Sequence, residues 1–156
     1  MRCKPRNRLE QSSTIGNKHG LGHTAVYLVD TSVLTRLRFP RIGSTLLGLG
    51  QLFYSPVSGL ELRYSASNES DYRKLTTILE GFDRLAIEDE AFDIADRTQR
   101  RLAKAGLKGR PVPDLIIAAQ AELAGLTMLH YDADFDLISS VTGQPTLWIT
   151  PQGSID

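Results

Sequence analysis

Four acidic residues stand where a parallel sheet would gather polar side chains. Asp30 follows the apolar run AVYLV, Asp132 follows LTMLHY, and Asp114 begins the apolar stretch LIIAAQAELAG. Glu61 comes shortly after the apolar run LFY. Ligands of open parallel sheets bind at the carboxyl ends of the strands, and carboxylates that meet there repel one another unless a cation neutralises them. Oxygen ligands favour Mg²⁺ or Mn²⁺, so the pattern predicts a metal site that could activate water against a phosphodiester.

Each acid also has a structural explanation when it is taken alone. Asp30 is a favoured N-cap for the helix expected after it, and Asp114 suits the first turn of a helix that follows proline. Glu61 would by itself be a solvated helix residue. The alternation DADFD from Asp132 resembles the start of an EF-hand loop, but the turn glycine and the terminal glutamate of that loop do not follow. The metal prediction therefore depends on the four acids together.

The elements that must position these acids alternate between strands and helices. Short apolar runs predict strands at residues 25–30, 52–54, 126–131 and 146–150, with a weaker one at 82–87. Apolar periodicity and capping residues predict helices at residues 32–37, 44–52, 88–107 and 132–141, and others that begin near residues 56, 68 and 113. Long crossovers without hairpin signals favour a mostly parallel sheet. The predicted fold is a three-layer α/β/α sandwich over residues 25–150, with a tail at 151–156.

The composition is that of an ordinary globular domain. The 156 residues are 41% hydrophobic and 23% charged, and no apolar stretch approaches the roughly 18 residues of a membrane span. The basic, polar start lacks the apolar segment of a secretory signal, and a single cysteine, Cys3, excludes a disulfide framework. These features predict a cytoplasmic protein without membrane contact.

The formal net charge is zero, but the charges are unevenly distributed. Residues 1–24 carry five bases and one acid, whereas residues 25–156 carry 13 bases and 17 acids. The Gly, Ser and Asn content of residues 1–24 predicts a basic, disordered extension outside the fold. His19 and His23 have the spacing of metal ligands, but two glycines separate them and no apolar helix face accompanies them. No metal site is expected there.

Four blocks of the chain together resemble the PIN-domain ribonucleases, and among them the VapC toxins of bacterial toxin–antitoxin pairs. The blocks are LVDTSVL, SGLELRYSA, PDLIIAAQA and HYDADFDLI, with 31, 53 and 18 residues separating the successive key acids. The resemblance runs from about residue 25 to residue 149. It implies a PIN-like fold in which a quartet of acids binds Mg²⁺ or Mn²⁺, namely Asp30, Glu61, Asp114 and Asp132.

Other residues in or beside these blocks could support the site. Asp134 would be either a supporting acid or an alternative ligand to the acid two positions before it. Thr31 and Ser32 would support the metal or the substrate phosphate, with helix capping as the alternative. Arg110 could reach an RNA phosphate, with an exposed loop arginine as the alternative. His130 stands where similar proteins often have a small hydroxyl residue, and we expect a partly buried structural histidine there in preference to a general base.

The resemblance implies a metal-dependent endoribonuclease that acts as the toxin of a toxin–antitoxin pair. Its substrate would be a structured RNA, either tRNA or rRNA, hydrolysed by metal-activated water without a covalent enzyme intermediate. A cognate VapB-like antitoxin would block the site, and the toxin would form a homodimer. The region from Leu60 to Phe82, with Tyr64 and Tyr72, is a candidate contact surface. The mildly acidic body departs from the positive excess that RNA binding favours.

Two other functions remain open at this point. One is a PIN-like module that binds RNA or a protein partner without cleavage. The other is a haloacid-dehalogenase-like phosphatase or a phospho-receiver domain, since both place an aspartate at the end of the first strand. Ser32 stands where the phosphatase needs its second aspartate, and no lysine follows Lys108 for the receiver. A P-loop is excluded because the glycines of GSTLLGLGQ lack the required lysine.

Overall fold

The computed structural model describes residues 24–155, in which five strands form one sheet. The strands are β1 (Val26–Val29), β2 (Gln51–Tyr54), β3 (Asp83–Arg84), β4 (Thr127–His130) and β5 (Thr146–Trp148). The helices are α1 (Thr31–Leu34), α2 (Pro40–Leu47), α3 (Pro56–Tyr64), α4 (Glu69–Leu79), α5 (Asp89–Lys104), α6 (Val112–Ala124) and α7 (Ala133–Thr142). Cys3, His19, His23 and nearly all of the predicted N-terminal extension lie outside the described residues.

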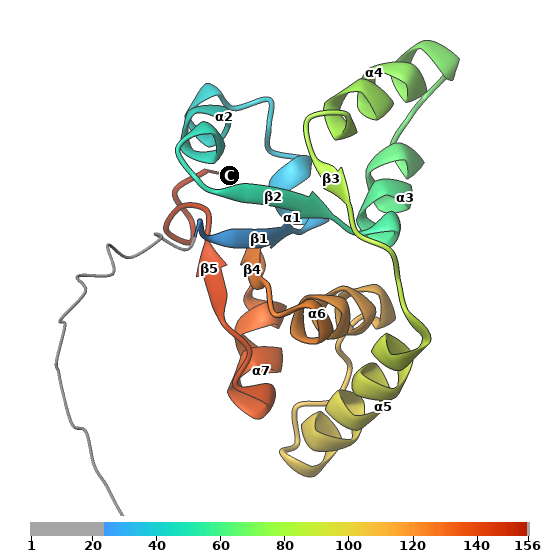
Figure 1. Ribbon diagram of the computed structural model, residues 1–156, viewed down its shortest axis with the longest axis vertical. Helices are drawn as coiled ribbons and strands as arrows, with labels where there is room; N and C mark the ends of the chain where they lie inside the picture. Colours follow the sequence, from blue (N-terminus) through green and yellow to red (C-terminus); the bar gives the residue numbers. More distant parts are fainter. Residues whose placement is uncertain (1–23, 156) are drawn as a thin grey trace, which may run out of the picture.

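Every strand pairing in the sheet is parallel, and the strand order is β3-β2-β1-β4-β5. The chain builds β1, β2 and β3 toward one edge, then returns through α5 and α6 to place β4 on the other side of β1 (Figure 1). The carboxyl ends of β1 and β4 therefore form the topological switch point, where parallel sheets open a crevice for ligands. The predicted parallel sheet is confirmed.

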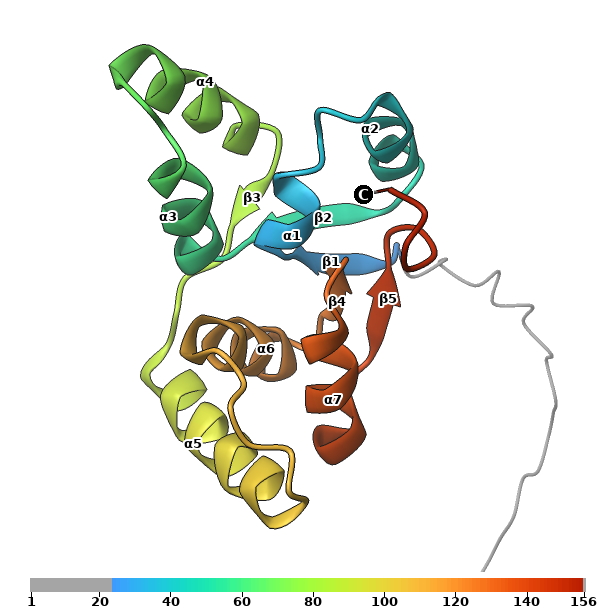
Figure 2. The same ribbon diagram turned by 180° about the vertical axis from the view of Figure 1, so that it is seen from behind.

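Helices cover both faces of this sheet. Successive strand residues point to opposite faces, so neighbouring residues of one strand pack against different helices. Leu28 and Met128 belong to one apolar cluster with residues of α5, α6 and α7. Val29 and Leu129 belong to a second cluster with residues of α1, α2, α3 and α4. Both views show α5, α6 and α7 on one side of the strands and α2, α3 and α4 on the other (Figures 1 and 2). The predicted three-layer α/β/α sandwich is confirmed.

The apolar helix α6 brings one of the four acids to the switch point. Residues 115, 117–119 and 121 are all buried, because α6 packs against β4 and lies in contact with α5 and α7. Gly125 ends the helix with a φ of 66°, and the chain then enters β4. A crossover helix runs back against the strands, so the N-terminus of α6 and Asp114 lie at their carboxyl ends. No helix in residues 24–155 is long and apolar enough to span a membrane.

Several element boundaries differ from the sequence predictions; α5, for example, ends at Lys104 instead of residue 107, and β5 ends at Trp148 instead of residue 150. The first helix, α1, ends at Leu34 instead of residue 37. The helix predicted at residues 44–52 is α2, which begins at Pro40, because proline suits the first helical position where the N–H is free in any case. It ends at Leu47, and residues 51–54 form a strand. The strand predicted at 82–87 is reduced to the two residues of β3.

Candidate metal centre

Asp30 lies at the carboxyl end of β1, where it both caps a helix and faces the crevice. Its side chain accepts a hydrogen bond of 2.8 Å from the backbone N–H of Ser32, as an N-cap does for α1. The residue is only 4% exposed. Burial raises the pKa of this carboxyl from 3.8 to about 6, the hydrogen bonds from Ser32 and Thr31 oppose the rise, and the charge of Glu61 adds to it. Asp30 therefore caps α1 and also belongs to the acidic cluster.

Asp114, in the first turn of α6, is the centre of the acidic cluster. Burial raises its pKa from 3.8 to about 7, and repulsion by the other acids adds to the rise, in the order Asp30, Asp132, Asp134 and Glu61. The pKa of this carboxyl is therefore raised by the charge of each of the four other acids that the sequence analysis singled out. Carboxylates gathered this closely repel one another, and a bound cation would offset that repulsion.

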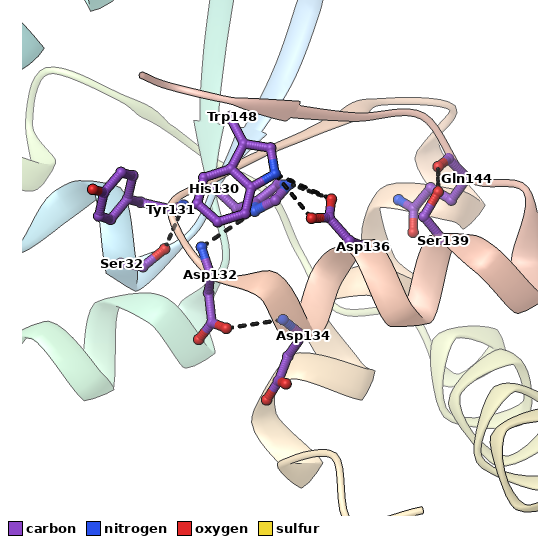
Figure 3. A network of polar contacts seen from close by, with 9 residues as sticks. All are labelled: Ser32, His130, Tyr131, Asp132, Asp134, Asp136, Ser139, Gln144 and Trp148. Carbon is purple, nitrogen blue, oxygen red and sulfur yellow. Dashed lines mark hydrogen bonds and ion pairs between the residues drawn. The ribbon is translucent and has the colours of Figure 1, made fainter. Parts of the chain in front are cut away.

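Three of these acids come within reach of one ion. One carboxylate oxygen from each of Asp114, Asp132 and Asp134 lies within 4.8 Å of the other two. Asp132 caps α7 and accepts a hydrogen bond of 2.9 Å from the backbone N–H of Asp134, which fixes the Asp132 side chain at the start of that helix (Figure 3). An all-oxygen, all-carboxylate donor set fits a hard divalent cation such as Mg²⁺ or Mn²⁺.

Glu61 is held at the edge of this cluster by a hydroxyl group. The Thr31 Oγ1 donates a hydrogen bond of 2.6 Å to Glu61 Oε2, linking the start of α1 to α3. The sequence analysis also considered helix capping as the role of Thr31 and Ser32. Asp30 is the N-cap of α1, and the Thr31 hydroxyl bonds Glu61 instead. Ser32 makes a different contact, in which its Oγ accepts a 2.9 Å hydrogen bond from the backbone N–H of Tyr131. Ser32 therefore ties the segment after β1 to the segment after β4.

Arg110 is the basic residue of the site. It precedes α6, and its Nη1 forms an ion pair with Asp134 Oδ1. Each side chain is 23% exposed, so this arginine is not the exposed loop residue that the sequence also allowed. The Nε atom of Arg110 is buried without a hydrogen-bond partner.

His130 is a core residue that contacts Asp132 of the acidic cluster. It is 0% exposed, and its ring packs against Phe135 and Trp148, with ring centroids 5.3 and 5.0 Å away. Nδ1 accepts a hydrogen bond of 3.3 Å from the backbone N–H of Asp132, so the ring proton of the neutral imidazole is on Nε2. Burial lowers the pKa of this imidazole, against the opposing charge of Asp136. The sequence analysis expected a partly buried structural histidine, and the structure instead buries His130 completely.

Asp136 and Trp148 form a support that the sequence analysis missed. The Trp148 Nε1 donates to both carboxylate oxygens of Asp136, at 3.2 and 3.0 Å, and Asp136 Oδ1 lies 3.7 Å from His130 Nε2 (Figure 3). The alternation DADFD contained the signal for Asp136, but its partner comes from β5, 12 residues later in the chain. Only the packing of α7 beside β5 brings the two together.

The region predicted for dimer contacts does carry exposed apolar side chains. Tyr64 at the end of α3 is 92% exposed, Leu60 is 66% exposed and Tyr72 on α4 is 47% exposed. None of the three lies in the metal centre described above.

Comparison with known proteins identifies the family. Residues 27–140 match the family model of the PIN domain. The chain is 45% identical over 133 residues to Ribonuclease VapC51 of Mycobacterium tuberculosis, covering 83% of this chain and 97% of that protein. It is 39% identical over 136 residues to Ribonuclease VapC18 of the same organism, covering 83% of this chain and 99% of that protein.

Solved structures show the same fold at lower identity. A VapBC-1 structure from nontypeable Haemophilus influenzae matches with a TM-score of 0.68 at 20% identity, covering 81% of this chain and 99% of the matched chain. A VapBC-5 structure from Mycobacterium tuberculosis matches with a TM-score of 0.59 at 23% identity, covering 81% and 99%. The chain belongs to the PIN-domain family. Within that family it belongs to the VapC ribonucleases of toxin–antitoxin systems.

Proposed function

We propose that this protein is a metal-dependent endoribonuclease that hydrolyses structured RNA, either tRNA or rRNA, as the toxin of a toxin–antitoxin pair. The observation that carries the proposal is the set of five carboxylates centred on Asp114, two of which have strongly raised pKa values. Such a concentration of negative charge would repel an RNA phosphate. A divalent cation between the carboxylates reverses that repulsion, so the site makes chemical sense as a metal-dependent one.

The quartet Asp30, Glu61, Asp114 and Asp132 would hold one or two Mg²⁺ or Mn²⁺ ions. When bound, a divalent cation would lower the pKa of a water molecule and offset the charge that builds on the phosphate during hydrolysis. Asp134 is the alternative ligand to Asp132, since one carboxylate oxygen of each lies within 4.8 Å of an oxygen of Asp114.

The neighbouring polar residues would position these carboxylates and the RNA. The Thr31 hydroxyl orients Glu61, and Ser32 holds the two strand exits together through its bonds to Asp30 and Tyr131. Arg110 is the basic group nearest to the carboxylates through its contact with Asp134, and it would bind a phosphate of the RNA backbone.

Two protein partners complete the proposal. Similar folds occur in a structure described as a member of the VapBC family of toxin–antitoxin systems and in one described as a toxin–antitoxin complex from Klebsiella pneumoniae, which supports a VapB-like antitoxin as the partner that blocks the site. The exposed Leu60, Tyr64 and Tyr72 would contact a second copy in a homodimer. A dimer would show in sedimentation or light scattering, and Tyr64→Ser would weaken it.

The test is cleavage of total bacterial RNA by the purified, antitoxin-free protein with Mg²⁺, Mn²⁺ or EDTA. Asp30→Asn keeps the size and the capping oxygen of the native residue, and Asp93→Asn on the exposed side of α5 is the matched control. We expect discrete cuts with the native protein and the control, only with metal, and a loss of about a hundredfold or more in Asp30→Asn. Metal binding without cleavage would support a non-cutting module or a phosphatase instead.

A further inference from the structure

The only ion pair in the metal centre, among residues 24–155, joins Arg110 to Asp134. Asp134 is one of the three acids whose oxygens converge within 4.8 Å. The guanidinium is therefore attached to a carboxylate that the cluster also offers to a metal ion. Within the metal-free protein, this contact supplies one positive charge to a group of five acidic side chains.

The backbone gives Arg110 a fixed place relative to the cluster. Arg110 directly precedes Pro111, the N-cap position of α6, and Asp114 follows in the first turn of that helix. Asp134 comes from the first turn of α7. The ion pair thus bridges the two helix N-termini that present the acids, and each partner keeps 23% of its side chain exposed to solvent. The Arg110 side chain is therefore in contact with solvent as well as with Asp134.

The unsatisfied Nε of Arg110 shows that the metal-free contact does not use the whole side chain. Nη1 binds Asp134, while Nε is buried and has no hydrogen-bond partner. A guanidinium has donors arranged as a planar fork that matches the two oxygens of a phosphate, and it keeps its charge at any working pH. The side chain is therefore better matched to a phosphate than to the single carboxylate oxygen it now binds.

We propose that Arg110 is a tethered counter-cation with two positions. In the absence of metal it neutralises Asp134 and competes with divalent cations for the acidic cluster. Once the carboxylates are occupied by metal, the guanidinium is repelled from Asp134 and binds a phosphate of the RNA. The inference rests on the proposed function and assigns the arginine opposite effects on two steps: it weakens metal binding and strengthens substrate binding.

The experiment measures Mn²⁺ affinity by titration calorimetry on the RNA-free protein, and RNA cleavage separately at saturating Mn²⁺. Arg110→Met removes the charge but keeps a long side chain, and Arg110→Gln is a second neutral variant in case the first misfolds. Arg97→Gln, on the exposed face of α5, is the matched control. We expect both neutral variants to bind Mn²⁺ about tenfold more tightly, because a nearby positive charge has been removed. We expect their cleavage to be about tenfold to a hundredfold slower, because a phosphate contact has been lost.

The outcomes separate this inference from the proposed function. Unchanged or weaker Mn²⁺ binding in folded neutral variants would overturn the competition and leave Arg110 as a structural clamp between α6 and α7. Tighter Mn²⁺ binding with undiminished cleavage would overturn the phosphate role. If the native protein and the Arg97→Gln control bind no Mn²⁺, the proposed metal-dependent function fails, and the inference fails with it.

Discussion

Replacing Asp114 with asparagine should stabilise the metal-free protein at neutral and alkaline pH. The native carboxyl has a pKa of about 7 in the folded protein and an ordinary value of 3.8 when exposed, because burial and four neighbouring acids disfavour its charge. Between these two values the unfolded chain has released the proton while the folded protein retains it. The native protein therefore loses stability as the pH rises through this window, and retains the full penalty above it.

The size of the penalty follows from the difference between the two pKa values. Each pKa unit corresponds to about 1.4 kcal/mol, so ionising Asp114 costs the folded state about 4 kcal/mol at a pH of about 8. The amide of the asparagine variant does not ionise and escapes this cost. Because neighbouring carboxyls adjust their own protonation, we expect Asp114→Asn to gain about 2 to 4 kcal/mol at pH 8, and less than about 1 kcal/mol at pH 4.

Urea unfolding in EDTA at several pH values measures this gain, with exposed Asp93→Asn as the control that should stay near zero throughout. Adding Mn²⁺ at high pH should then reverse the order of stability. The native protein gains free energy from binding the ion, whereas Asp114→Asn has lost a ligand. A variant no more stable than the native protein at pH 8, or a difference that does not change with pH, would refute the electrostatic reasoning about this cluster.

Three further substitutions test other parts of the structure. Thr31→Val removes the 2.6 Å hydrogen bond to Glu61, and since bonds to charged groups contribute about 1.5 to 3 kcal/mol, we expect RNA cleavage to fall about tenfold or more while Thr31→Ser retains it. Equal cleavage by the Val and Ser variants would contradict this role. Gly50→Ala would place a Cβ atom 1.8 Å from the carbonyl oxygen of Ala25, so the urea midpoint should drop by the equivalent of about 1 to 3 kcal/mol. Gly43→Ala in α2 meets nothing within 4 Å and should instead gain about 0.5 to 1 kcal/mol, and the reverse order would show that the strands tolerate the clash.

The order of strands and helices could be predicted from local sequence signals. The run at Val26–Val29 is apolar on both faces because helices cover both sides of the sheet, and Asp30 ends it with a capping side chain. The limits of α6 could be predicted in the same way, from the proline near its start and from Gly125 after its end. The elements with weaker signals were placed less well, since α2 and β3 depend on the contacts around them. In β3, two exposed residues form a strand only because β2 lies beside them.

The acids of the cluster were identified from their positions after strands and at helix starts, but their spatial relations were not. Sequence separations do not say that Asp114 senses all four other acids, or that Arg110 contacts Asp134 across 24 residues. Nor do they show that Trp148 holds Asp136 beside His130.

The sequence alone therefore determined the α/β alternation, the family resemblance and the candidate acids, because capping, apolar runs and motif spacing are properties of neighbouring residues. The tertiary structure alone decided which carboxylates converge, which one carries a counter-cation and how deeply each is buried. Those properties depend on the pairing of β4 with β1, which places the starts of α6 and α7 beside the end of β1. Charge repulsion and desolvation act through space, so they become defined only when the strand order is known.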